Sequence, residues 1–185
     1  MKVSEFINWW SNHNMRTDGR NNLDETDILW NELYSRLEKG EKIARLKIVK
    51  KSTLLFRVHQ GMEEPPEWEE FEGRNRAKER YDELYSIWEK GSKVNFNNHW
   101  LSFTDDINSI GSTYFTGKGL RGHVIVMSSN KAINISDSVT ANLTDEKEIV
   151  APLKEENLIE LLPFKEFIKK YGKGTSDYER FHIKI

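Results

Sequence analysis

Two glutamates one residue apart, Glu146 and Glu148, stand at the head of a short apolar run late in the chain. In an extended strand, side chains at positions i and i+2 point to the same side, so the sequence predicts that both carboxylates face one cleft. Like charges held that close perturb each other's ionisation, and such pairs often occur where chemistry is done. In a chain with 30 acidic residues, a solvated strand edge is the alternative, and the motif alone favours it.

Two other strand-like segments carry a polar residue inside an apolar run. Arg57 lies in Leu-Phe-Arg-Val, within the β-rich residues 53–59, and Ser102 lies in Trp-Leu-Ser-Phe-Thr, at the end of residues 96–104. The chain therefore presents an arginine, a serine and Glu-x-Glu in that order, each on a predicted strand.

This order resembles the mono-ADP-ribosyltransferases of the Arg–Ser–Glu type, a group that includes bacterial toxins and T-even phage enzymes. The resemblance covers residues 53–152. It implies an α+β, ADP-ribosyltransferase-like fold, in which a helical N-terminal half packs on two small antiparallel-rich sheets around an NAD cleft. The serine motif reads Ser-Phe-Thr rather than Ser-Thr-Ser, and Arg57 is followed by Val-His-Gln-Gly rather than directly by glycine.

The resemblance implies a role for each motif residue. Arg57 would bind the NAD pyrophosphate, because a guanidinium can donate two charge-assisted hydrogen bonds to it. Glu148 would stabilise the oxocarbenium ion that develops when the nicotinamide–ribose bond breaks. Glu146 would hold or deprotonate the incoming nucleophile. Ser102 would donate a hydrogen bond to Glu148 and fix its rotamer.

Three further residues are weaker candidates for the NAD site. Thr104 would support the same strand end as Ser102. Phe115 sits where the family places an aromatic near the nicotinamide, although a core phenylalanine is about as probable. His59 shares a strand face with Arg57 and could line the cleft beside it, but a structural or surface role is the better expectation for each of the 5 histidines.

The implied activity is transfer of ADP-ribose from NAD to a macromolecule, with release of nicotinamide. Protein arginine is the expected acceptor, because family members with glutamate at the Glu146 position commonly modify arginine. RNA or another nucleic acid is an alternative, and a basic cluster over residues 42–51 is its local support. Two other functions are considered: a binding module of the same fold that has no catalytic activity, and an NAD glycohydrolase.

Composition bounds these expectations. The chain has 185 residues, a formal charge of −2 and no cysteine, which predicts one domain, no global basic field and no disulfide or thiolate metal site. Histidine spacing indicates no metal site, so NAD is the one expected cofactor, as a substrate. The polar N-terminus and the lack of a long apolar run predict a cytoplasmic protein without a membrane partner. A phage enzyme or an intracellular toxin fits, with a possible antitoxin that contacts Trp9, Trp10 and Trp68.

The predicted elements place helices in the first half and strands in the second. The N-terminal part, residues 1–50, is helical, and residues 53–152 form the motif-bearing core. Helices are expected over residues 4–16, 24–38, 75–90 and 164–171, and strands over residues 53–59, 96–104, 120–127, 146–151, 158–163 and 178–185. In the second helix, Ile28, Leu29, Leu33, Tyr34 and Leu37 are the expected apolar stripe. The polar connection of residues 128–145 is longer than most loops and matches the family's acceptor-contacting loop.

Overall fold

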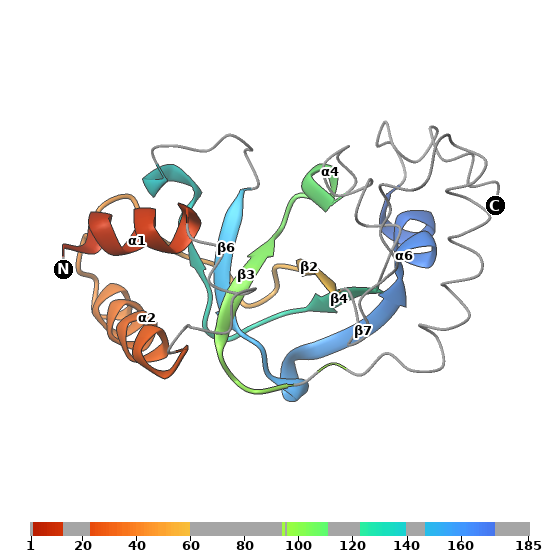
Figure 1. Ribbon diagram of the computed structural model, residues 1–185, viewed down its shortest axis with the longest axis horizontal. Helices are drawn as coiled ribbons and strands as arrows, with labels where there is room; N and C mark the ends of the chain where they lie inside the picture. Colours follow the sequence, from red (N-terminus) through yellow and green to blue (C-terminus); the bar gives the residue numbers. More distant parts are fainter. Residues whose placement is uncertain are drawn as a thin grey trace. The chain divides into compact units, whose positions relative to one another are not determined.

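The computed structural model describes residues 2–12, 23–59, 94, 96–110, 123–139 and 147–172 (Figure 1). Its contacts divide the chain into two compact units. Unit 1 comprises Met1–Leu55, Phe96–Asp105 and Ser128–Asn157, and unit 2 comprises Phe56–Asn95, Asp106–Met127 and Leu158–Ile185. Over the described residues there are four α-helices and seven strands, which confirms the predicted α+β class.

Unit 1 contains four strands in the order β1-β5-β6-β3. Their bounds are Lys47–Ile48 for β1, Trp100–Thr104 for β3, Ile133–Asn134 for β5 and Glu148–Pro152 for β6. The pairs β1–β5, β5–β6 and β3–β6 are all antiparallel. Every residue of β3 and β6 is buried, so this strand pair forms the centre of the unit.

Two helices, α1 (Val3–Asn12) and α2 (Leu23–Glu38), lie on one side of β3 and β6 (Figure 1). Their buried aromatic rings meet Trp100 of β3 in a single core. The ring of Trp30 lies 4.8 Å from Phe6, 5.3 Å from Trp10 and 6.2 Å from Trp100, measured between centroids. Aromatic rings bury more apolar area than other side chains, so this cluster is the main reason that both helices stay on the strands.

The buried face of α2 differs from the expected stripe. Leu33 and Tyr34 are buried as predicted, but Ile28 is 67% exposed and Leu29 is exposed as well. Thr26 and Trp30 are buried in their place. At 3.6 residues per turn, Ile28 lies on the opposite side of the helix from Trp30, so the fit of the large indole among the other rings decides which face turns inward.

Unit 2 carries β4 (His123–Met127), β7 (Leu158–Pro163) and most of β2 (Leu55–His59), in the order β2-β4-β7. The strands β4 and β7 are antiparallel, with a register shift between Val126 and Met127. The helix α6 (Phe164–Tyr171) follows β7 directly, and the Phe167 ring packs 5.2 Å from Phe56 of β2. A short helix, α4 (Ile107–Ile110), also belongs to this unit.

Most predicted elements that fall on described residues are confirmed. The elements β7 and α6 have the predicted bounds, α2 begins one residue earlier than predicted, and the other elements begin or end at different residues. The polar connection after β4 contains β5 and a 3₁₀ turn, η2 (Ser136–Ser138), and a second turn, η3 (Glu155–Asn157), precedes β7. The expected helix over residues 75–90 and the expected strand over residues 178–185 lie outside the described residues. Across the part of the chain that is described, no helix is both long and apolar enough to cross a membrane.

A left-handed residue shapes the connection from α2 to β1. Ala44 has a φ of 46°, a conformation that glycine adopts more readily than any residue with a Cβ. Side chains in that region cost about 1–2 kcal/mol, whereas the extra freedom of glycine in the unfolded chain costs about 0.4–1 kcal/mol.

We therefore expect Ala44→Gly to leave the free energy of unfolding unchanged or to raise it by up to about 1 kcal/mol. Ala151→Gly is the matched control, because Ala151 is buried in the middle of β6 and should lose about 1 kcal/mol or more. Guanidinium unfolding followed by circular dichroism measures both. A loss at Ala44 as large as the loss at Ala151 would contradict the argument.

Candidate functional site

Glu148 is the first residue of β6 and the most buried carboxylate among the described residues, with 7% of its surface exposed. Its main chain is held on two sides. Across β3 it stands opposite Thr104, and its carbonyl oxygen accepts hydrogen bonds from the Ile135 amide at 3.1 Å and the Ser136 hydroxyl at 3.3 Å. The backbone of Glu148, which carries the carboxylate, is therefore held in place at the start of β6.

Three neutral donors reach the Glu148 carboxylate. The indole Nε1 of Trp10 donates to Oε1 at 3.0 Å, and the hydroxyl of Ser102 donates to the same oxygen. The hydroxyl of Ser11 donates to Oε2 at 3.3 Å. No lysine, arginine or histidine pairs with this carboxylate in the described parts of the chain. Burying a carboxylate costs free energy, and the hydrogen bonds from these three donors offset part of that cost.

The strand register explains why Ser102 reaches Glu148. In the β3–β6 pair, Ser102 stands opposite Val150 and Thr104 stands opposite Glu148, so all four side chains share one face of the strands. Ser102 is thus the diagonal neighbour of Glu148, within reach of a short hydroxyl. The hydrogen bond that the sequence predicted between these two residues is present. Thr104 is buried directly across from Glu148, at the strand end where it was expected.

Helix α1 supplies the other two donors. Trp10 and Ser11 are in its last turn, and the face of the strands that carries Glu148 also carries Val150 and Trp100, which belong to the aromatic core beneath α1 and α2. The C-terminal end of a helix carries partial negative charge, so the helix itself does not favour a carboxylate there. The two side chains, rather than the helix dipole, hold Glu148.

The prediction that Glu146 and Glu148 lie on one extended strand, with their carboxylates on the same side, is wrong. The strand β6 begins at Glu148, and Lys147 lies outside it with a φ of 45°, in the left-handed region. A left-handed residue interrupts the alternation of side chains along a strand. The i, i+2 rule therefore does not place the Glu146 carboxylate on the side of Glu148, and Glu146 itself lies outside the described residues.

Two of the predicted NAD-binding residues, Arg57 and His59, fall outside unit 1. Arg57 is half-buried in the middle of β2, and His59 is the last residue of that strand. Both belong to unit 2, whereas Glu148, Ser102 and Thr104 belong to unit 1. Phe115 lies outside the described residues.

A different group of side chains has the composition of a metal site. Ligand atoms of Asp24, Asp27 and His99 lie within 4.8 Å of one another in unit 1. Asp27 already has other partners, since Oδ1 accepts from the Trp100 amide at 2.8 Å and Oδ2 lies 2.6 Å from His99 Nδ1. These bonds tie the start of β3 to α2.

The sequence reasoning missed Trp10 and Ser11. They lie 138 and 137 residues from Glu148 along the chain, so no local spacing connects them to the glutamate. The N-terminal helix was expected to dock through its aromatic residues, and Trp10 does so: its ring is buried against Trp30 and its Nε1 is bound to Glu148. Its suggested contact with an antitoxin is therefore wrong. Trp9 is half-buried, and Trp68 lies outside the described residues.

Comparisons with protein-family models, with curated proteins and with solved structures found no match. The likeness to ADP-ribosyltransferases therefore rests on the order of the sequence motifs.

Proposed function

We propose that the chain is an NAD-dependent mono-ADP-ribosyltransferase that transfers ADP-ribose to a macromolecular acceptor. The hydrogen bond between Ser102 and Glu148 is the observation that carries this proposal. The motif order predicted that a serine on one strand would hold a glutamate on another, and the register of β3 and β6 provides that contact. A rigidly held, largely desolvated carboxylate is suited to stabilising a developing cation.

In the proposed reaction, the bond between the anomeric carbon of the ribose and the nicotinamide nitrogen breaks, and nicotinamide leaves as a neutral molecule. Glu148 stabilises the positive charge that develops on the ribose. A nucleophile on the acceptor then forms a bond to the same carbon and releases its proton, for which Glu146 is the proposed base. Arg57 is the proposed ligand of the NAD pyrophosphate.

Protein arginine is the proposed acceptor, because the chain has Glu-x-Glu rather than Gln-x-Glu at its third motif. RNA is the alternative acceptor. Digestion of labelled reaction products from a cell lysate with protease, and separately with RNase, distinguishes them, since only one treatment should release the label.

The burial of Glu148 supports a second candidate function. A carboxylate that is 7% exposed and bonded to α1 through Trp10 and Ser11 also acts as an anchor for that helix. On this account the protein is a binding module that keeps the motif residues as structural contacts and performs no turnover. The two functions differ in what an isosteric change at Glu148 does.

Glu148→Gln should abolish activity without unfolding the protein. The amide oxygen of glutamine can accept from Trp10 and Ser102, and its NH₂ group can donate to the Ser11 hydroxyl, so the hydrogen bonds of the site can all be kept. The loss of the negative charge should reduce nicotinamide release by about 10²–10³-fold. The assay uses labelled NAD with lysate, and thermal unfolding reports stability.

Glu160→Gln is the control for this experiment. Glu160 is a partly buried glutamate of β7 that pairs with Lys170 at 2.7 Å, and it has no proposed part in the reaction. If the wild-type protein neither labels an acceptor nor releases nicotinamide, the enzyme proposal fails and the binding module remains.

Arg57→Ala should weaken NAD binding by about 10–100-fold, the value expected for loss of about 1.5–3 kcal/mol of charged hydrogen bonding. Calorimetric titration with NAD measures the change. Arg36→Ala is the control, because Arg36 is engaged with Glu41 on the outside of α2. Equal NAD affinity in the wild type and Arg57→Ala would remove Arg57 from the site.

Glu146→Ala should abolish transfer to the acceptor and spare hydrolysis of NAD, because its proposed role begins after the nicotinamide bond breaks. Both activities are measured in one reaction, by acceptor label and by free nicotinamide. Glu156→Ala, at an exposed position of η3, is the control. Equal loss of the two activities in Glu146→Ala would contradict its role as the base.

A further inference from the structure

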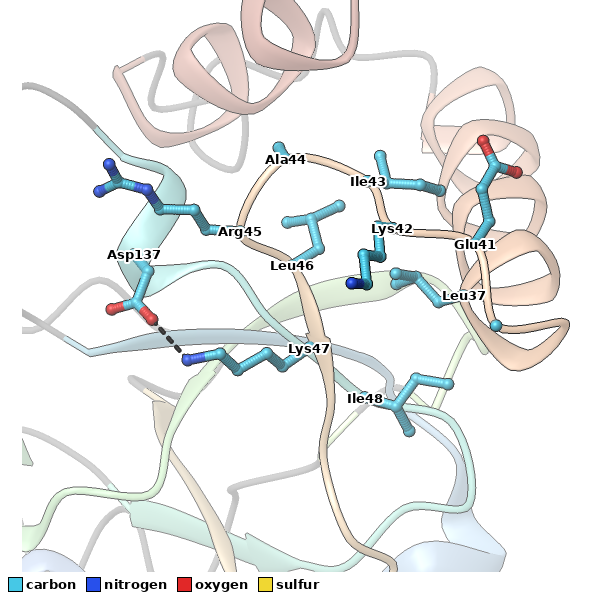
Figure 2. A pocket seen from close by; sticks show the side chains of 11 residues that line it. Leu37, Glu41, Lys42, Ile43, Ala44, Arg45, Leu46, Lys47, Ile48 and Asp137 are labelled. Atoms are coloured by element: carbon cyan, nitrogen blue, oxygen red, sulfur yellow. Dashed lines mark hydrogen bonds and ion pairs between the residues drawn. The ribbon is translucent and has the colours of Figure 1, made fainter.

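A shallow groove of about 570 Å³ runs along the connection between α2 and β1 in unit 1 (Figure 2). The segment of residues 40–48 forms most of its lining, with Leu37 and Asp137 at its margins. It takes no part in the proposed transfer reaction, and neither Glu148 nor Ser102 lines it.

The segment around the groove is strongly basic. Residues 39–51 contain six lysines and arginines and one glutamate, in a chain whose net charge is −2. The side chains of Lys42, Arg45 and Lys47 line the groove and are exposed to solvent. Lys50 and Lys51 follow directly after β1 and are exposed as well. The charge of the protein is therefore unevenly distributed, with a local cationic surface here.

The acidic residues of the groove are already engaged. Glu41 is bound by Arg36 at 2.8 Å, which lowers the pKa of Glu41, and Lys47 lies 2.8 Å from Asp137, which lowers the pKa of Asp137. In Figure 2, Glu41 points away from Asp137, whereas the charged ends of Arg45 and Lys47 lie on either side of Asp137. No ion pair joins Lys42, Lys50 or Lys51 to another described residue.

Buried residues anchor the backbone from which Lys42, Arg45 and Lys47 project. Ile43 and Leu46 are buried in the aromatic core of unit 1, and the Leu46 amide bonds to the Ile43 carbonyl at 3.1 Å across the left-handed Ala44. The residues between and beside these anchors project outward. Buried apolar residues thus alternate with exposed cations, so these cations belong to a folded segment and not to a free tail.

We propose that this groove binds the phosphate backbone of single-stranded RNA. Exposed lysines and arginines around a concave path, with their acidic neighbours neutralised, match a linear polyanion. No aromatic side chain lines the groove among the described residues, so base stacking does not contribute and the binding is independent of sequence. A lipid surface is less well matched, because interfacial segments insert large apolar side chains. Among the described residues that line the groove, Ile48, 40% exposed, is the most exposed large apolar residue.

Fluorescence anisotropy with a short labelled RNA of mixed sequence, in the absence of NAD, tests the proposal. The dissociation constant should lie at about 10⁻⁴–10⁻⁶ M near physiological salt, and it should rise with salt. Each phosphate contact contributes about −0.7 to the slope of log K against log salt for a single strand. Lys42→Gln/Arg45→Gln should therefore reduce the slope by about 1.4 and weaken binding.

Lys2→Gln/Lys154→Gln is the matched control, since it removes the same charge from unit 1 at positions that do not line the groove. It should retain most of the affinity and the slope. The single variant Arg45→Gln, at an exposed side chain, provides a second measurement should the double variant lose stability.

Three results would overturn the proposal: no RNA binding by the wild type at low salt, an equal effect of the groove and control variants, or binding to vesicles of phosphatidylcholine and phosphatidylserine in preference to RNA. The assay contains no NAD, so its outcome is independent of whether the chain transfers ADP-ribose.

Discussion

The hydrogen bonds to the Glu148 carboxylate are the polar contacts that join α1, β3 and β6 above the aromatic core of unit 1. Among the described residues this buried carboxylate has no cationic partner, and Trp10, Ser11 and Ser102 supply donors to it from a helix and a strand that are distant in sequence. Loss of one donor would leave a buried charge short of a partner, which costs about 1–3 kcal/mol or more. The same contacts therefore stabilise the fold and define the position of the proposed catalytic group.

This double role links the aromatic core to the proposed chemistry. The indole of Trp10 packs its ring against Trp30 and directs its Nε1 to Glu148, so the packing of α1 sets the geometry at the end of β6. Buried charges in largely apolar surroundings are typical of functional sites, because a protein selected for stability alone would place an apolar residue there. Ser102 from β3 and Trp10 from α1 leave the glutamate little freedom to change rotamer.

The basic groove adds a separate feature to unit 1. Its cations alternate with the core residues Ile43 and Leu46, so the same short segment contributes to the hydrophobic core and to the charged surface. The proposed transferase activity and the proposed RNA contact share this scaffold, but they depend on different side chains. If the acceptor is RNA, the groove would bind the substrate of the transfer reaction. If the acceptor is protein arginine, RNA binding and ADP-ribose transfer would be separate functions.

The amino-acid sequence by itself determined the α+β class and the positions of most strands, and the resemblance of its motifs led to the expectation that Ser102 bonds to Glu148. Strand propensity is a local property, whereas the register that brings Ser102 to Glu148 belongs to the pairing of β3 with β6. The tertiary structure decided the rest. It ended the strand at Glu148 with a left-handed Lys147, which removed the geometric basis for pairing Glu146 with Glu148. It turned α2 so that Trp30 rather than Ile28 is buried, and it brought Trp10 and Ser11 to the carboxylate. These outcomes depend on how large side chains fit together across the whole chain, which no local spacing encodes.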